Sequence, residues 1–144
     1  MMKEFNIYYI EKLIDTSSKV LADIYNIPEK EIRTVGKRTK NIMEARRMFM
    51  FYLNRHLEIK HAHMKKYIKG INHATSIHHC NKMEFLISMS DKKLYKIYDE
   101  QYSEFKKRMK QHDTLNRVII EKKEQMIQLQ AELNTYFKEY VERI

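Results

Sequence analysis

The fold is decided by residues 60–83, which read KHAHMKKYIKGINHATSIHHCNKM. Lys60 to Ile68 predicts a short helix, and the tight turn Lys69-Gly70-Ile71-Asn72 follows it. Gly70 stands where a left-handed helix cap is expected. Asn72 is a good N-cap for the next helix, which the apolar spacing predicts from His73 to about Met89. We therefore expect two helices joined by a short turn that contains glycine.

The residues before this pair also predict helices. Residues 3–14 form one amphipathic helix, and the capping side chains of Asp15-Thr16-Ser17-Ser18 begin a second one that runs to Tyr25. Pro28 opens a short helix that ends near Thr34, and residues 36–40 form a basic loop. The stretch from Asn41 to Leu57 is apolar almost all round its middle, so we expect it to be the buried central helix.

The composition favours an all-α protein. The 144 residues include two glycines and one proline, too few for the many turns of a β-rich fold. No apolar run approaches the roughly 18 residues of a membrane span, and the N-terminus lacks the apolar block of a signal peptide. A single cysteine, Cys80, fits a reducing interior. We expect a cytoplasmic protein, in the host cytoplasm if a phage encodes it.

From Asp91 onward the sequence becomes a highly charged helix, so we divide the chain into a domain at 1–90 and an extension at 91–144. His112-Asp113-Thr114 either breaks this extension into two helices or lies inside one. Steps of four and three residues, with Lys122 as the one polar member, give the extension a coiled-coil-like seam. The apolar seam residues are Leu115, Ile119, Met126, Leu129, Leu133, Tyr136 and Tyr140.

Further apolar residues beside the seam widen the apolar face of the extension. Val118, Ile120, Ile127 and Phe137 lie there, which favours packing in a bundle over a plain two-stranded coil. The extension either joins two chains as a homodimer or bundle, or folds back on the domain.

The positive charge is concentrated in one segment. Residues 30–70 hold twelve basic and three acidic side chains, a net charge of +9. The segments before and after it have net charges of −2 and +2, so this segment of 41 residues accounts for the whole excess of +9. A phosphate-binding surface collects charge in this way. A solvated basic face is the alternative.

The helix pair at 60–89 beside this charge has the form of a helix-turn-helix. Four segments then resemble, in order and spacing, the C-terminal DNA-binding domain of the bacterial replication initiator DnaA. They are residues 20–27, VLADIYNI; 37–42, KRTKNI; 44–50, EARRMFM; and 72–83, NHATSIHHCNKM. The likeness covers about residues 16–86. It implies an all-α, Trp-repressor-like helix-turn-helix domain that needs no cofactor.

The resemblance implies a role for individual residues. Asn72, His73 and Ala74 would meet base edges in the major groove, and Arg46 would enter the adjacent minor groove. Contacts to the DNA backbone set affinity and register without reading sequence. The resemblance and the basic surface together assign such contacts to Lys37, Arg38, Lys40, Arg47, Arg55, Lys65, Lys66, Lys69, Thr75 and His78.

The chain departs from the family signature at three positions. Asn72, Ala74 and Ser76 replace the Asp, the first Thr and the Val of Asp-His-Thr-Thr-Val. An Asp only accepts hydrogen bonds, which suits cytosine, whereas Asn72 also donates and suits adenine. We expect a target related to the DnaA box and altered where these residues read. No nucleotide-binding Gly-x-x-x-x-Gly-Lys loop is present, so the ATPase activity of the initiator is not expected.

Other functions fit the sequence less well. Six potential metal ligands lie at 61–80, but His61 and His63 do not share a helix face. The other four lie within or beside the DNA-reading motif, which accounts for them (His73, His78, His79 and Cys80). Paired catalytic carboxylates are absent from the basic region. An RNA-binding surface would need exposed aromatic platforms.

We therefore expect no enzyme and no metal site, but a sequence-preferring double-stranded DNA-binding protein that acts in replication initiation at an origin or in transcription regulation, in a phage or mobile element. The alternative is a helical scaffold whose tail binds a protein partner and whose basic face binds nucleic acid without sequence preference.

Overall fold

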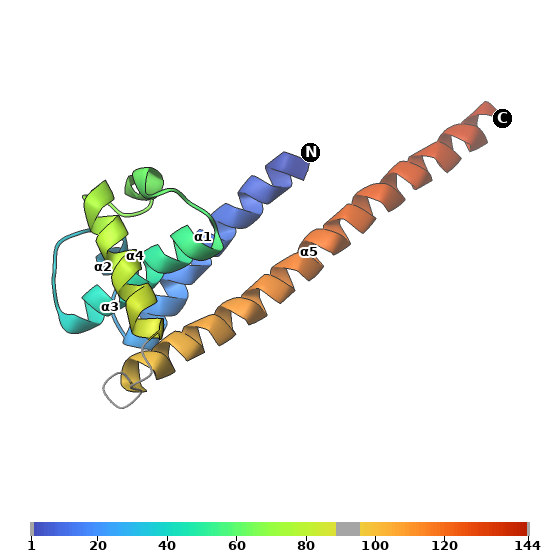
Figure 1. Ribbon diagram of the computed structural model, residues 1–144. Coiled ribbons are helices and arrows are strands. Elements are labelled where there is room, and N and C mark those ends of the chain that lie inside the picture. The colour runs from blue at the N-terminus through green and yellow to red at the C-terminus, as the bar shows by residue number, and fades with distance from the viewer. Residues whose placement is uncertain (1, 89–95, 144) are drawn as a thin grey trace. The chain divides into compact units, whose positions relative to one another are not determined.

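The computed structural model describes residues 2–88 and 96–143, and every regular element in these ranges is a helix (Figure 1). Within them, extended residues pair only at an isolated bridge between Thr34 and Lys69. The predicted all-α class is confirmed. The elements are α1 (Met2–Tyr25), α2 (Glu29–Arg33), α3 (Lys40–Phe51), a π-helical turn η1 (Tyr52–His56), a 3-10 helix η2 (His61–Lys66), α4 (His73–Ser88) and α5 (Lys96–Glu142).

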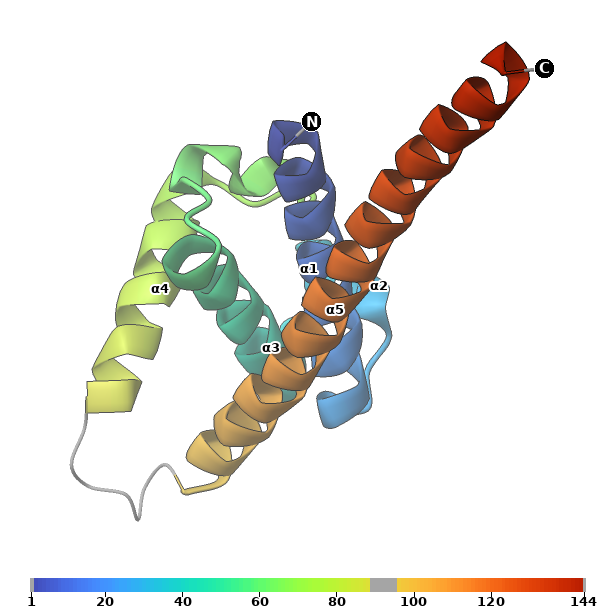
Figure 2. The ribbon, with the colours of Figure 1, turned by 90° about the vertical axis from the view of Figure 1, so that its right-hand side faces the viewer.

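The chain divides into two compact units, Met1–Lys110 and Gln111–Ile144. In the first unit α3 is the central helix and packs against α1, α2 and α4 (Figure 2). Its middle is buried on all sides, as the sequence predicts, with Met48, Phe49 and Met50 fully inside the core. Phe105 and Met109 of α5 join the same core. The sequence predicted that the helix beginning at His73 ends at about Met89 and that the domain ends at Ser90. Both positions lie outside the described residues.

The N-terminal segment forms one helix where the sequence predicted two. The hydroxyls of Ser17 and Ser18 do not cap a new helix but donate backwards to the carbonyl oxygens of Ile14 (2.7 Å) and Asp15 (3.0 Å). Serine inside a helix can satisfy its hydroxyl in this way, which removes the break that its capping preference suggests. α1 therefore continues to Tyr25 and stops before Asn26, whose φ is +53°.

The turn before α4 has the predicted geometry. Gly70 adopts a φ of +87°, in the left-handed region that glycine enters without steric cost. The side-chain oxygen of Asn72 accepts a hydrogen bond from the backbone N–H of Thr75 (2.7 Å), so the predicted N-cap is confirmed. The chain therefore turns sharply and presents the first turn of α4 in a fixed orientation.

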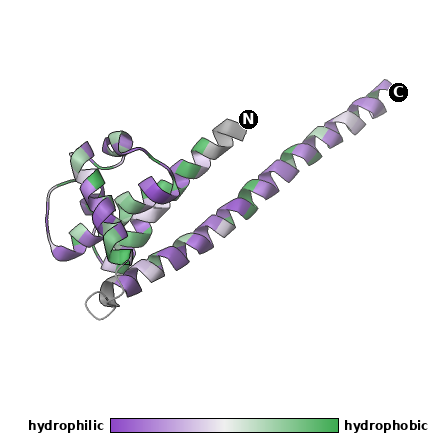
Figure 3. Ribbon diagram, viewed as in Figure 1, coloured by the Kyte–Doolittle hydropathy of each residue, from purple (hydrophilic) through white to green (hydrophobic). Residues whose placement is uncertain are grey.

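The second unit contains the rest of α5, which we call the tail (residues 111–144). The helix passes through residues 112–114 without a break and ends at Glu142. Every residue from 121 to 143 is exposed, and hydrophobic bands recur along the helix (Figure 3). No helix of the described residues has the length and apolarity that crossing a bilayer requires.

Candidate nucleic-acid interface

A short backbone bridge joins the basic loop to the turn before α4. The N–H of Val35 donates to the carbonyl oxygen of Lys69, and the N–H of Lys69 donates to the carbonyl oxygen of Arg33, both at 2.8 Å. Thr34 and Lys69 are thereby paired in parallel. Residues 36–40 and 69–72 leave this bridge from neighbouring positions, although 28 residues separate the two segments in sequence. Two segments that lie apart in the sequence therefore start from neighbouring points on the domain.

The loop of residues 36–40 is fully on the surface. Lys37, Arg38 and Lys40 are exposed, and the acid that Lys37 approaches is Glu31, at 3.9 Å. An ion pair this long, with the lysine side chain largely in solvent, holds Lys37 weakly. Thr39 accepts a hydrogen bond from the N–H of Ile42 (3.4 Å) and so begins α3. The loop is therefore anchored at both ends while its cations remain accessible.

The first turn of α4 presents polar side chains to solvent. Asn72, His73 and Ala74 are exposed, as is His78 one turn later, whereas Thr75 is partly buried. The cap uses one lone pair of the Asn72 carbonyl oxygen and leaves the second lone pair and the amide N–H groups available. Asn72 can therefore hold the helix start and still offer both a donor and an acceptor.

Further cations surround this turn. Lys65, Lys66 and Lys69 are exposed on η2 and on the chain that leads into α4. Lys60, which was not among the predicted contacts, is exposed as well. Arg55 is half exposed and pairs with Glu84 at 2.9 Å. We call the exposed cations of residues 37–40 and 60–69, together with the first turn of α4, the basic face.

Arg46 does not belong to the basic face, contrary to the sequence-based expectation of a minor-groove contact. Its side chain is buried, with a residue exposure of 3 %. One guanidinium nitrogen donates to the carbonyl oxygens of Glu31 (2.6 Å) and Thr34 (2.9 Å). Burial lowers the pKa of Arg46 from its ordinary value, but an arginine keeps its proton. Arg46 thus fastens α2 and the bridge residue Thr34 to α3 from inside.

Arg47 is also buried, so its expected place on a phosphate-facing rim is not what the structure shows. Its Nε donates to Nδ1 of His79 at 3.3 Å. Burial, followed by the charge of Arg47, lowers the pKa of His79 to about 4. His79 is therefore neutral near pH 7, with its proton on Nε2, since Nδ1 accepts. This pair ties α3 to α4 beneath the basic face.

The depressed pKa of His79 predicts a loss of stability in mild acid. The unfolded chain takes up the proton near pH 6.5, whereas the folded chain resists it to about pH 4. The free energy of unfolding should fall through this range, by up to about 3 kcal/mol. Urea unfolding at pH 7 and pH 5 measures the loss. His79→Gln should make the free energy of unfolding less dependent on pH, while His63→Gln, at an exposed site, should not. An equal change of this free energy between the two pH values in all three proteins would contradict the role of His79.

A histidine and a serine join η2 to α4. Nδ1 of His61 lies 2.8 Å from Oγ of the fully buried Ser76, and its ring meets that of His73 edge to face at 6.0 Å.

Among the described residues no three histidine, cysteine or acidic side chains converge as a metal site would require. Cys80 is buried, and burial raises its pKa to about 11, which makes it a poor nucleophile.

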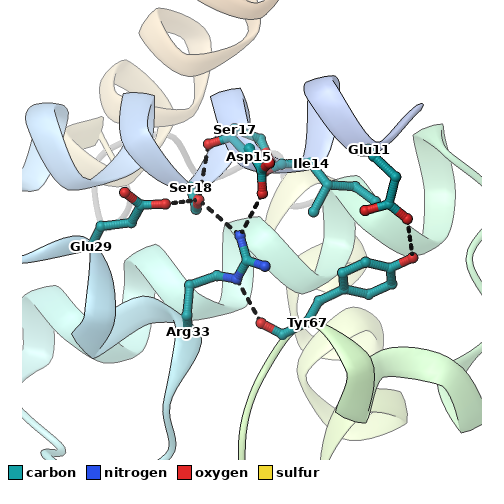
Figure 4. A network of polar contacts seen from close by, with 8 residues as sticks. All are labelled: Glu11, Ile14, Asp15, Ser17, Ser18, Glu29, Arg33 and Tyr67. Atoms are coloured by element: carbon teal, nitrogen blue, oxygen red, sulfur yellow. Dashed lines mark hydrogen bonds and ion pairs between the residues drawn. The ribbon is translucent and has the colours of Figure 1, made fainter. Parts of the chain in front are cut away.

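A polar network that the sequence did not predict supports the turn from the side of α1 (Figure 4). The guanidinium of Arg33 donates to the carbonyl oxygen of Tyr67 (2.6 Å) and approaches Asp15 and Ser18, each at 3.3 Å. The hydroxyl oxygen of Ser18 also lies 2.6 Å from a carboxylate oxygen of Glu29. Arg33 therefore connects α1, α2 and the end of η2. Its position in a basic segment gave no sign of this structural role.

The sequence comparison assigns the domain to a family. Residues 10–83 match the family described as "Bacterial dnaA protein helix-turn-helix". The chain belongs to this family. The helix-turn-helix of the dnaA protein is a binding module rather than an enzyme fold, and membership supports DNA binding by this chain. Neither the curated proteins nor the solved structures contain a match.

Membership in the dnaA helix-turn-helix family gives one sequence departure a structural meaning. Ser76 replaces the valine of the family signature at a position that is fully buried. A buried hydroxyl requires a hydrogen-bond partner, and His61 supplies it from η2. The departure at Ser76 therefore concerns packing between η2 and α4, whereas Asn72 and Ala74 remain on the exposed surface.

Proposed function

We propose that the chain is a sequence-preferring double-stranded DNA-binding protein whose basic face straddles the duplex. The observation that carries this proposal is the bridge between Thr34 and Lys69, which sets the basic loop beside the turn before α4. The first turn of α4 would enter the major groove with Asn72, His73 and Ala74 at base edges. Lys65, Lys66, Lys69, Thr75 and His78 would contact the backbone, as would the loop lysines Lys37 and Lys40.

Because Arg46 is buried, another residue would have to make a contact in the minor groove. Arg38 is the arginine of the exposed loop, and it lies near enough to Arg46 to lower the pKa of Arg46. A narrow minor groove attracts an inserted arginine because its negative potential is high there. We assign this contact to Arg38. Arg38→Lys keeps the charge, so it should weaken discrimination among narrow-groove sequences more than it weakens general affinity.

The biological setting that we propose is replication initiation at an origin or transcription regulation, in a phage or mobile element. Both require a protein that finds a particular duplex sequence. Selection of bound duplexes from a random pool by the full chain tests the proposal. We expect a site related to the DnaA box, and Asn72→Asp should change the preferred base at one position. Enrichment of no sequence, or of one site by both proteins, would contradict the assignment.

The loop lysines should contribute through the salt dependence of binding. If about six phosphates are neutralised, the logarithm of the affinity falls with a slope near −5 against the logarithm of the salt concentration. Lys37→Ala combined with Lys40→Ala should reduce the slope by about 2. Fluorescence anisotropy with a selected duplex measures it. Lys123→Ala combined with Lys138→Ala, at exposed tail positions, is the matched control, and an equal change in both would remove the loop from the interface.

The exposed apolar seam of the tail favours a second candidate, a helical scaffold whose tail binds a protein partner. Such a scaffold would hold nucleic acid through charge alone. Gel shifts with competitor DNA separate the two functions, because a scaffold shows no preference among duplexes of equal length.

A further inference from the structure

The tail carries a long apolar seam that the described residues of its own unit leave exposed. Six of the seven apolar seam residues are between 57 and 70 % exposed, and Ile119 is half-buried. The exposed six are spread over about seven helical turns, so they cannot cover one another. Isolated surface leucines are common, but a continuous apolar stripe of this length indicates a missing partner. The six are Leu115, Met126, Leu129, Leu133, Tyr136 and Tyr140.

The charge of the tail narrows the class of partner. Residues 111–144 contain five basic and six acidic side chains, a net charge of −1. DNA requires a basic surface, and helices that lie on anionic membranes carry lysine and arginine over their polar face. Neither describes this helix. Its apolar positions follow a heptad repeat, which buries them best against another helix of the same repeat.

We propose that a second copy of this chain covers the seam, with the two tails antiparallel. In the pairing that aligns the whole seam, Leu115 faces Tyr140 of the second copy and Ile119 faces Tyr136. Met126 faces Leu129, and Lys122 faces Leu133. Each of the eight seam positions then has a partner in the other chain.

Lys122 decides between the two orientations. In a parallel pair in register, the two Lys122 ammonium groups would occupy one layer of the seam and repel each other. In the antiparallel pair each lysine faces Leu133, which lies eleven residues from Lys122, so the two charges are about 16 Å apart along the axis. Glu132 adjoins Leu133 and offers the lysine an opposite charge at the rim of the seam. The antiparallel arrangement thus removes a repulsion and gains an attraction.

The sizes of the side chains favour the same orientation. Apart from Lys122, the seam positions before Tyr136 carry leucine, isoleucine or methionine, and tyrosines end the seam at Tyr136 and Tyr140. A parallel pair would crowd four tyrosines into two adjacent layers and leave thinner layers at the other end. The antiparallel pair sets each tyrosine against an aliphatic side chain, and facing large with small residues keeps a helical interface evenly packed.

The proposal has a geometric consequence for the DNA-binding units. In the antiparallel pair, the residues numbered 111 in the two chains lie about 50 Å apart along the helix axis, since helices rise 1.5 Å per residue. The two basic faces are therefore attached at well-separated points. The pairing goes beyond the DNA-binding function proposed above and does not depend on it.

Solution size and disulfide cross-linking of the full chain test the proposal. Sedimentation equilibrium should give twice the 17.7-kDa mass of the chain. When Leu115→Cys and Tyr140→Cys chains are mixed and oxidised, the cross-linked product should contain one of each. The native Cys80 should stay out of the reaction because it is buried and its pKa is raised to about 11.

The control pair is Arg117→Cys with Lys138→Cys. In the proposed pairing these two residues lie level with each other along the helix axis, but on the face of each helix that points away from the seam. They should therefore not cross-link. A mass of one chain at tens of micromolar would overturn the proposal, as would cross-links between two Leu115→Cys chains. Either result leaves the affinity of a single unit for DNA unaffected, so this failure is distinct from a failure of the proposed function.

Discussion

Arg46→Ala should lower the free energy of unfolding by about 2–4 kcal/mol. The substitution removes the donor that serves the carbonyl oxygens of Glu31 and Thr34, and it leaves a cavity on the face of α3 toward α2. An unsatisfied polar group costs about 1–3 kcal/mol, and a cavity in a core adds to that cost. Urea unfolding of the full chain measures the change.

A comparison with Arg55 separates the structural role of Arg46 from a direct contact with DNA. Arg55→Ala removes an arginine whose ion pair with Glu84 is half exposed, so its stability should change by about 1 kcal/mol or less. Under conditions where Arg46→Ala is folded, it should retain much of its affinity for DNA. If Arg46→Ala left stability unchanged and greatly reduced the affinity for DNA, Arg46 would be a direct minor-groove contact after all.

Phe105→Ala should destabilise the first unit by about 3–5 kcal/mol. The ring is 1 % exposed and meets Tyr52 edge to face at a centroid distance of 5.4 Å. Truncating a buried phenylalanine removes its transfer free energy and leaves a cavity. The loss should appear as a lower midpoint in thermal or urea unfolding.

Phe85 provides the matched control for Phe105. It is 58 % exposed on α4, so Phe85→Ala should change stability by about 0.5 kcal/mol or less. If both substitutions cost the same, the first part of α5 does not belong to the core. Fragments of the protein made for DNA-binding studies should accordingly end no earlier than Lys110, the last residue of the first unit.

Local signals predicted much of the fold. Asn72 and Gly70 predicted the turn before α4 because only a few residue types favour a helix N-cap or a positive φ. The run around Phe49 predicted the central helix because only a buried helix is apolar all round. Ser17 and Ser18 misled the prediction for α1, since a serine hydroxyl can cap a helix or bond back within one.

The roles of individual arginines were much harder to predict. Arg46 and Arg47 lie on a helix in a basic segment, and nothing in their spacing shows that they point inward. Their partners are a pair of backbone carbonyls and a histidine more than thirty residues away, which only the fold brings near. The burial of Phe105 was missed for a similar reason, because it stands among charged residues from 99 to 110.

Hydrogen exchange of the full chain, measured with and without a selected duplex, tests most directly whether the basic loop and the turn before α4 form one DNA-binding surface. Bound DNA should slow exchange in two segments together, residues 36–40 and residues 69–75, and leave residues 121–143 unchanged. Protection of only one of the two segments, or protection confined to the tail, would contradict the account.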